Sequence, residues 1–285
     1  MTVERIAAFS DAGKGGNPAG IAIADQFPPE AEMRRIAAEV GYSETAFAVP
    51  DGAAEHWRVR YFSPESEVAF CGHATIALGA ALARHSGDGR YHLKLNTAEI
   101  TVEALAAGSG YSAALQSPPT SSKPARPGLL DETLALFGYQ VDQLDPKLPP
   151  AEIHGGADHL VITLKHRADL ASMNYDLDAG RALMRKYALV TIMLVWVRND
   201  TEFDVRNAFA SGGVLEDPAT GAAAAAFAGY LRDLGWPHGN HIHIVQGEDM
   251  GEKSVIEAQF SDQPGSSIRI SGATRMIDAA PAVDR

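Results

Sequence analysis

Long apolar runs are absent from this chain of 285 residues. No stretch approaches the roughly 18 uninterrupted apolar residues that a membrane-spanning helix needs. The first residues carry no apolar stretch after a basic start, so we expect no signal peptide. The single cysteine, Cys71, can form neither an internal disulfide nor a cysteine-based zinc site. These absences are typical of a protein from a reducing compartment, and we expect a cytoplasmic location.

Positive charge is also scarce, because 24 lysines and arginines stand against 36 aspartates and glutamates, a formal net charge of -12. Such a surface repels phosphate backbones and anionic lipid heads, so we expect neither a nucleic-acid nor a membrane partner. The glycine-rich loops that bind dinucleotides and nucleotides are missing as well. His241 and His243 share one face of a predicted strand, but no HExxH motif and no acidic cluster completes a ligand set, so we expect no metal.

The residues that are present indicate a globular protein with a substantial core, since 46% are hydrophobic and 21% are charged. Helical spacing of apolar residues after Pro28 predicts a helix that ends at Gly41, and a short helix is predicted over Asp131–Phe137. Apolar runs and alternating patterns predict the strands. These are Val3–Phe9, Gly20–Ala24, Thr45–Val49, His56–Phe62, Tyr91–Leu95, Glu99–Leu105, Tyr111–Gln116, Leu160–Leu164, Leu189–Val197, Phe203–Ala208, Ile242–Val245, Val255–Phe260 and Ile268–Ile270.

Two further predicted helices, His73–Arg84 and Gly221–Leu231, are apolar nearly all round, which is typical of buried helices. Between them, Ser117–Pro124 is rich in serine and proline and is the best candidate for a linker. We therefore divide the chain into residues 1–118 and residues 119–285.

The two apolar helices belong to an internal repeat. Residues 59–82 align with residues 205–228 without a gap, which places Arg60 on Arg206 and Cys71 on Asp217. Both segments have the order strand, polar loop, reactive residue and buried helix. This pattern predicts a duplicated half-domain with a cleft at the pseudo-twofold axis.

The starts of the two apolar helices are candidate anion sites. The first backbone N–H groups of a helix lack intrahelical partners and carry partial positive charge. Donors would come from Gly72, His73 and Ala74 in one half, and from Thr220, Gly221 and Ala222 in the other. Each glycine alone is explained by tight entry into a helix, but the matched pair favours binding of a carboxylate.

Four side chains near these starts have the chemistry of proton transfer. Glu44 precedes an apolar strand, where desolvation suits a carboxylate to exchange a proton near neutral pH, although from position alone a solvated glutamate is the more common case. Cys71 is a candidate thiolate or a small buried apolar residue. His73 is a candidate proton donor or a solvent-facing histidine. Asp217 is a candidate acid or base, or an N-cap, a role for which Thr220 competes.

Several segments together resemble the phenazine-biosynthesis PhzF-like family of the diaminopimelate-epimerase-like superfamily. They run in the family's order along nearly the whole chain. They are Gly16-Asn17-Pro18-Ala19, Ser43-Glu44-Thr45-Ala46-Phe47, Phe62-Ser63-Pro64 with Glu67-Val68, Cys71-Gly72-His73-Ala74-Thr75, Glu216-Asp217-Pro218-Ala219-Thr220-Gly221, and Gln246-Gly247 with Met250-Gly251.

The resemblance implies an α+β, two-domain α/β fold of the diaminopimelate-epimerase type, in which each half wraps a curved sheet around a central helix. It also implies isomerisation without cofactor or metal, a cleft between the halves, a homodimer, and a C-terminal strand that crosses back to the first half. In the phenazine enzymes a glutamate moves a proton between carbons of a dihydro-hydroxyanthranilate ring, a role that falls on Glu44. His73 and Asp217 match the family's other catalytic polar positions. The residues assigned to substrate binding are Asn17, Ser43, Gly72, Thr220, Gly221 and Ala222.

The chain departs from the family pattern at three places. Ala222 stands where the phenazine enzymes have a serine, and Glu252-Lys253 stands where many relatives have Arg-Pro. The epimerase branch uses two opposed cysteines, whereas here Cys71 aligns with Asp217. We therefore expect a substrate other than the phenazine precursor.

The main hypothesis is an isomerase of a small organic acid in which Glu44 carries the proton. A second hypothesis is a racemase, epimerase or dehydratase that uses Cys71 and Asp217 as opposed bases. A third is a binding or interaction protein without catalysis on the same fold, suggested by the missing serine at Ala222.

Overall fold

The structure is a computed structural model that describes residues 1–108 and 110–277. Its contacts divide the chain into two compact units, the first formed by Met1–Leu115 with the segment from Ser271 onward, and the second by Gln116–Ile270. The predicted division after residue 118 falls three residues later than this one. The last strand belongs to the first unit, so the chain returns to that unit after completing the second.

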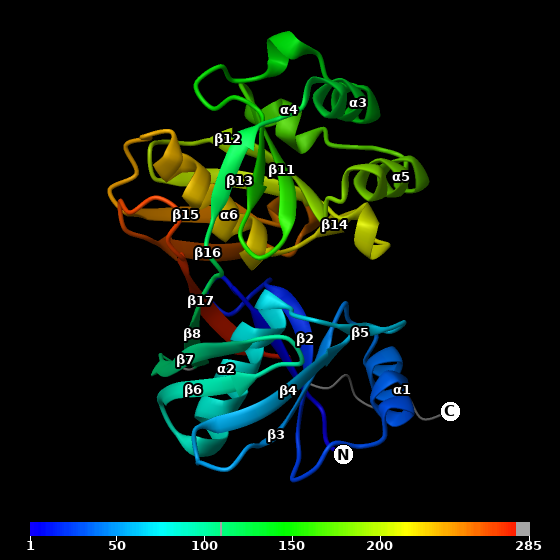
Figure 1. Ribbon diagram of the computed structural model, residues 1–285, viewed down its shortest axis with the longest axis vertical. Coiled ribbons are helices and arrows are strands. Elements are labelled where there is room, and N and C mark those ends of the chain that lie inside the picture. Colours follow the sequence, from blue (N-terminus) through cyan, green and yellow to red (C-terminus); the bar gives the residue numbers. More distant parts are fainter. Residues whose placement is uncertain (109, 278–285) are drawn as a thin grey trace. The chain divides into compact units, whose positions relative to one another are not determined.

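The first unit is a closed sheet around one helix (Figure 1). Strand pairings run from β1 through β2, β3, β4, β6, β7 and β8 to β17, which pairs back with β1. Helix α2 packs against β1, β2 and β7 inside this ring. The elements are β1 Glu4–Ala8, β2 Asn17–Ile23, α1 Glu30–Val40, β3 Thr45–Pro50, β4 His56–Phe62, β5 Glu67–Val68, α2 Gly72–Ser86, β6 Gly89–Lys94, β7 Glu99–Ala107, β8 Gly110–Gln116 and β17 Arg269–Met276.

The second unit has the same plan, with a curved sheet in the order β9-β10-β11-β12-β13-β15-β16 and helix α6 against β9, β10 and β16. Helices α3 and α5 pack on each other. The elements are β9 Ser121–Pro124, α3 Pro127–Phe137, η1 Val141–Gln143, β10 Ala151–His154, β11 Asp158–Leu164, α4 Arg167–Ala171, α5 Leu177–Tyr187, β12 Thr191–Val197, β13 Glu202–Ala208, η2 Ala210–Gly212, β14 Glu216–Asp217, α6 Gly221–Asp233, β15 His241–Gln246, η3 Glu248–Met250 and β16 Ser254–Gln259.

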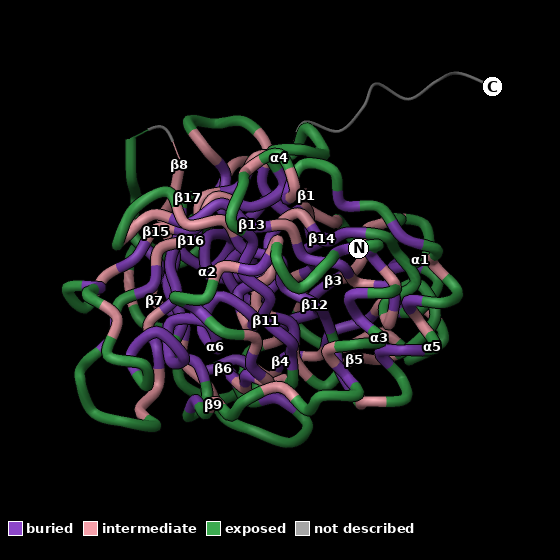
Figure 2. Tube along the Cα trace, turned by 90° about the horizontal axis from the view of Figure 1, so that it is seen from above, coloured by how far each residue is buried: buried purple, intermediate pink, exposed green. Residues whose placement is uncertain are grey.

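The two central helices are buried because their residues are small and apolar all round. Residues 73–83 of α2 and 223–232 of α6 are buried, and Figure 2 shows buried stretches along the helices and strands, with exposed stretches along the loops. Small residues let the helices lie close to the strands: a Cβ on Gly79 would lie 2.6 Å from Val102, and one on Gly229 would lie 2.4 Å from Thr120. The prediction of two buried helices is confirmed.

Three predictions about secondary structure are wrong in detail. The predicted linker is partly a strand, because Ser121–Pro124 forms β9 and pairs with β10. Strand β9 is the first strand in the sheet order of this unit, and its residues are mostly exposed and polar. They therefore lack the apolar alternation from which strands were predicted. The last strand runs on to Met276, well past the predicted end at Ile270. Helices α4 and α5 and strand β10 were not predicted, since they are short or carry a narrow apolar face.

The internal repeat is real, but its alignment needs a gap. Strand β4 pairs Phe62 with Glu67, and β13 pairs Ala208 with Glu216. The loop between the paired residues spans 63–66 in the first unit and 209–215 in the second, so it is 7 − 4 = 3 residues longer in the second. The offset is therefore 208 − 62 = 146 in the strands and 216 − 67 = 149 after the loop.

This longer loop changes which residues correspond. With an offset of 149, Cys71 corresponds to Thr220, and each is the N-cap of its central helix. The gap-free placement of Cys71 on Asp217 is wrong, because Asp217 corresponds to Val68 in the short strand before the helix. The loop insertion could not be seen in the sequence, since identities between the copies are few.

A buried histidine in the second unit makes its stability depend on pH. His159 on β11 is fully buried, its Nδ1 lies 2.7 Å from the Thr191 hydroxyl, and burial lowers the pKa of its imidazole to about 3 from 6.5. The unfolded chain then binds a proton that the folded chain does not, so the free energy of unfolding is highest above pH 6.5 and falls as the pH drops toward 3.

We expect His159→Phe to weaken this dependence. Between pH 5.5 and 4 the variant should lose about 1.4 kcal/mol less per pH unit than the wild type, the value for one proton. Urea unfolding at a series of pH values measures both slopes. Parallel curves for the two proteins would show that His159 takes no part in the acid response.

Among the described residues, no helix combines the length and the apolar character that crossing a membrane requires.

Candidate functional site

The first unit brings Glu44, Cys71 and His73 together at the start of α2. The Glu44 Oε2 atom lies 3.5 Å from Nε2 of His73, and Sγ of Cys71 lies 3.3 Å from Nδ1 of the same ring. The Ser43 hydroxyl oxygen lies 3.5 Å from His73 Nε2. The Glu44 carboxylate, the Ser43 hydroxyl and the Cys71 thiol therefore all gather around the nitrogens of the His73 imidazole.

These side chains are shielded from water. The Glu44 side chain is 13% exposed and the His73 side chain 7%. The solvated glutamate and the solvent-facing histidine that the sequence allowed are thus both excluded. Cys71 is buried as well, but its thiol touches the His73 ring and is more than an apolar filler.

Backbone pairing explains why Glu44 sits at this place. Strand β3 begins at Thr45 and runs parallel to β2, with Gly20 opposite Thr45. The Gly20 N–H donates to the Glu44 carbonyl at 3.2 Å, which fixes the residue at the end of the sheet. A Cβ on Gly20 would lie 2.7 Å from the Thr45 hydroxyl, so glycine is needed there. Asn17, at the start of β2, is buried.

The start of α2 is anchored below the cluster. Thr75 donates from its N–H and from its hydroxyl to the Cys71 carbonyl, at 3.0 and 2.7 Å. Its hydroxyl oxygen also lies 2.6 Å from the Tyr61 hydroxyl. Burial raises the pKa of Tyr61, so this phenol stays neutral and serves as a structural contact. The N–H groups of Gly72 and His73 lie in the first helical turn, where helix geometry leaves donors without intrahelical partners.

The second unit builds a separate polar group around Asp217. The Thr220 hydroxyl donates to Asp217 Oδ2 at 2.5 Å, and the Gln246 amide donates to the Asp217 carbonyl at 2.6 Å. Gln246 also accepts from the Thr220 N–H at 3.2 Å. Asp217 is buried and lies on β14, so it is not the N-cap of α6; Thr220 holds that position.

Gln246 is the residue whose role sequence reasoning missed. It matched a family segment, yet no contact could be assigned to it. It is completely buried at the end of β15, on the same face as Ile242 and Ile244, and a polar side chain at the last position of an apolar face was the available signal. The next residue must be glycine, because a Cβ on Gly247 would lie 2.5 Å from the Glu252 carbonyl oxygen.

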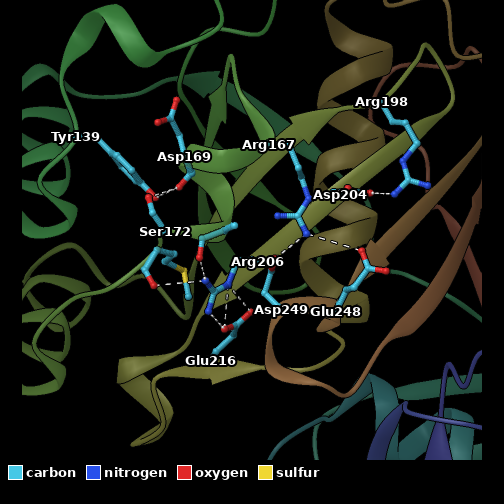
Figure 3. A network of polar contacts seen from close by, with 12 residues as sticks. Tyr139, Arg167, Asp169, Ser172, Arg198, Asp204, Arg206, Glu216, Glu248 and Asp249 are labelled. Carbon is cyan, nitrogen blue, oxygen red and sulfur yellow. Dashed lines mark hydrogen bonds and ion pairs between the residues drawn. The ribbon is translucent and has the colours of Figure 1, made fainter.

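A network of charged side chains holds the strand of Asp217 in place (Figure 3). Arg206 on β13 pairs with Glu216 at 2.5 Å and donates to the Ala171 carbonyl. Burial would lower the pKa of the Arg206 guanidinium, but its hydrogen bonds and charge pairing with Glu216 outweigh this and raise it. The guanidinium therefore stays charged and fixes the residue next to Asp217.

The same network fixes the loop after Gln246. Arg167 forms ion pairs with Asp204 on β13 at 2.9 Å and with Asp249, a residue of η3, at 2.8 Å (Figure 3). Arg198 binds the other oxygen of Asp204 at 2.6 Å. Partly or fully buried ion pairs therefore fix both the strand that carries Asp217 and the loop that follows Gln246.

The first unit carries a counterpart of the Arg206 pair. Arg60 on β4 contacts both oxygens of Glu67 on β5, at 2.7 and 2.6 Å. With the corrected alignment these residues correspond to Arg206 and Glu216. The arginine–glutamate pair before each central helix is therefore a shared feature of the repeat, which supports common positions for the residues that follow it.

The model of the family described as phenazine biosynthesis-like protein matches residues 6–279. An uncharacterized isomerase of Deinococcus radiodurans is 31% identical, over 89% of this chain and 85% of its own. The trans-2,3-dihydro-3-hydroxyanthranilate isomerase of Pseudomonas fluorescens is 28% identical, over 93% of this chain and 92% of its own.

A solved structure shares the fold. The phenazine biosynthesis protein of the PhzF family from Bacillus anthracis superposes with a TM-score of 0.83, at 21% identity, over 98% of each chain. The diaminopimelate-epimerase-like fold expected from the sequence is confirmed.

Proposed function

The chain belongs to the phenazine biosynthesis-like protein family and is an isomerase, and on this premise we propose that it moves a proton between carbons of a small carboxylate-bearing metabolite, with Glu44 as the proton carrier. The observation that carries the proposal is the shielded contact between Glu44 and His73. A carboxylate held in low-polarity surroundings beside an imidazole is suited to take a proton from carbon and return it.

His73 has the role of orienting Glu44 and the substrate. Its Nε2 lies close to Glu44 and Ser43, and the Cys71 sulfur lies close to both ring nitrogens, so these contacts restrict the position of the ring. A fixed ring favours a single direction of the Glu44 carboxylate. Positioning of this kind lowers the barrier because the reacting groups need not be ordered during the reaction.

The substrate class follows from the donors at the helix starts. We assign binding of a carboxylate or similar anion to the start of each central helix taken by itself, through the N–H group at Gly72 in α2 and those at Gly221 and Ala222 in α6. We assign substrate binding to the polar side chains of Asn17 and Ser43 in the first unit and of Thr220 in the second, and to Asp217 the orientation or protonation of the substrate. The proposed chemistry requires no metal and no coenzyme. A homodimer and a cytoplasmic location stay predictions.

The test is solvent exchange. The protein is incubated in heavy water with a panel of cyclic and acyclic amino and hydroxy acids, and mass gain is read by mass spectrometry. Deuterium entering one compound at carbon, together with formation of its isomer, supports the proposal and identifies the substrate class. Isomer formation without any solvent label and without a response to Glu44 substitution would overturn it.

A second candidate function is suggested by the contact of Cys71 with the His73 ring, because a thiol beside an imidazole is the arrangement of many reactive cysteines. In this reading Cys71 is a base of a racemase, epimerase or dehydratase. The corrected repeat alignment weakens the hypothesis that Cys71 and Asp217 are opposed bases. The counterpart of Cys71 is Thr220, whose hydroxyl is no base at neutral pH. The third hypothesis, a binding protein without catalysis, has no support in the comparisons, because the named relatives are isomerases.

Replacing Cys71 by alanine separates the two mechanisms. If Glu44 carries the proton, we expect the variant to keep its exchange rate within about tenfold of the wild type, whereas loss of a catalytic base costs about 10²- to 10⁴-fold. The rate of deuterium incorporation is the measurement. A loss in the larger range, in a variant with unchanged circular dichroism, would favour the thiol mechanism.

A further inference from the structure

The outer face of the sheet in the second unit carries two histidines and a glutamate side by side. Strand β15 alternates, with Ile242 and Ile244 buried against the core and His241 and His243 on the opposite face. Strand β16 lies beside β15 (Figure 1) and runs antiparallel to it. The pairing register places Glu257 directly opposite His243. Directly paired residues of neighbouring strands project from the same face, so the three side chains converge.

The distances are those of a ligand set before metal binding. The His241 Nε2 atom lies 3.9 Å from one Glu257 carboxylate oxygen, and the His243 Nδ1 atom lies 4.0 Å from the other. One donor atom from each residue lies within 4.8 Å of the other two. Two ligands about 2.1 Å from a tetrahedral zinc ion lie about 3.4 Å apart, so small side-chain rotations close the set.

The local environment favours a cation at this place. The His241 Nε2 atom is covered from solvent and has no hydrogen-bond partner among the described residues. A covered ring nitrogen without a partner is unfavourable, and a metal ion would engage it. Glu202 on β13 pairs in register with His243 and adds a second carboxylate to the same face.

We propose that His241, His243 and Glu257 bind one divalent transition-metal ion of the zinc, nickel or copper class. Two imidazoles and one carboxylate suit these ions, whereas magnesium and calcium prefer oxygen ligands alone. The side chains are 36%, 39% and 43% exposed, so solvent reaches the remaining coordination position. The site is independent of the proposed isomerase chemistry, because none of these residues belongs to the groups around Glu44 and Asp217.

The sequence-based expectation of no metal rested on the missing acidic partner. Glu257 stands 14 residues after His243, and the turn between β15 and β16 brings it back into register. Only strand pairing therefore reveals the complete set.

Zinc binding to the chelator-treated full-length protein tests the proposal. In calorimetric titration with zinc chloride we expect one equivalent per chain, and a rise in the melting temperature when zinc is present. His243→Ala and Glu257→Gln should each weaken zinc binding at least about tenfold. Mutating residues that only hydrogen-bond to metal ligands already lowers metal affinity by about that factor. Magnesium chloride in place of zinc should give no binding.

Two control variants exclude other sites. His166→Ala removes an exposed histidine at the start of α4 and should bind zinc like the wild type. Glu44, Cys71 and His73 form the other group of possible metal ligands among the described residues. Cys71→Ala disrupts that group and should still bind one equivalent of zinc per chain. If His243→Ala fails to fold, Glu257→Gln carries the test, because it keeps the shape of an exposed side chain. Absent stoichiometric binding, or binding lost only in Cys71→Ala, overturns the proposal.

Discussion

Replacing Glu44 by glutamine is expected to reduce the isomerisation rate and solvent exchange by about 10²- to 10⁴-fold, the contribution typical of a general acid–base. Glutamine keeps the size of the side chain that lies against His73, but it cannot take up a proton from carbon. The measurement is deuterium incorporation into the substrate identified from the panel, compared between the variant and the wild type.

The matched control is Glu39→Gln on α1, the same change at a side chain that is 63% exposed. It should exchange deuterium at the wild-type rate, and both variants should keep the circular dichroism of the wild type. Activity of Glu44→Gln within tenfold of the wild type would remove Glu44 as the proton carrier and shift the assignment to Cys71 or Asp217.

Replacing Phe227 by alanine is expected to lower the free energy of unfolding by about 3–5 kcal/mol, as for other large aromatic side chains deleted from a core. Phe227 is completely buried in α6, and its ring meets Phe203 edge to face at a centroid distance of 5.0 Å. The helix is held in place by apolar packing on several sides, so a cavity there weakens the centre of the second unit. Urea unfolding followed by circular dichroism measures the change.

The control is Leu234→Ala at the end of the same helix, where the side chain is 44% exposed. A surface change of this kind usually stays within about 0.5 kcal/mol. Equal effects of the two substitutions would mean that α6 is not the packed centre of its unit.

The central helices could be predicted because their signal is local. An apolar character on every side of a segment such as His73–Arg84 leaves burial as the only stable arrangement, whatever surrounds it. The helix after Pro28 was found for a similar reason, since its start residues, its apolar spacing and its end at Gly41 lie within one short segment. Strand β9 was missed because its residues carry no apolar alternation and its stability comes from pairing with β10.

For the candidate site, the sequence identified the residues but not their contacts. Glu44, His73 and Cys71 were selected from their neighbours along the chain and from the family segments, yet their shielding and the 3.5 Å approach of Glu44 to His73 depend on how β3 lies beside β2. The buried amide of Gln246 binds the residues around Asp217, and its only signal in the sequence was a polar side chain at the last position of an apolar strand face.

By itself, the sequence determined the two buried helices and the residue types available for proton transfer, because composition and periodicity depend on a few neighbouring residues. The class of fold followed from the resemblance of short segments to a known family. Tertiary structure decided which residues of the repeat correspond. A loop that is three residues longer in the second copy makes Thr220, and not Asp217, the counterpart of Cys71. Tertiary structure also decided that Glu257 joins His241 and His243, because strand pairing joins residues that the chain keeps apart. Contacts between distant residues depend on loop lengths and strand register, which no single segment records.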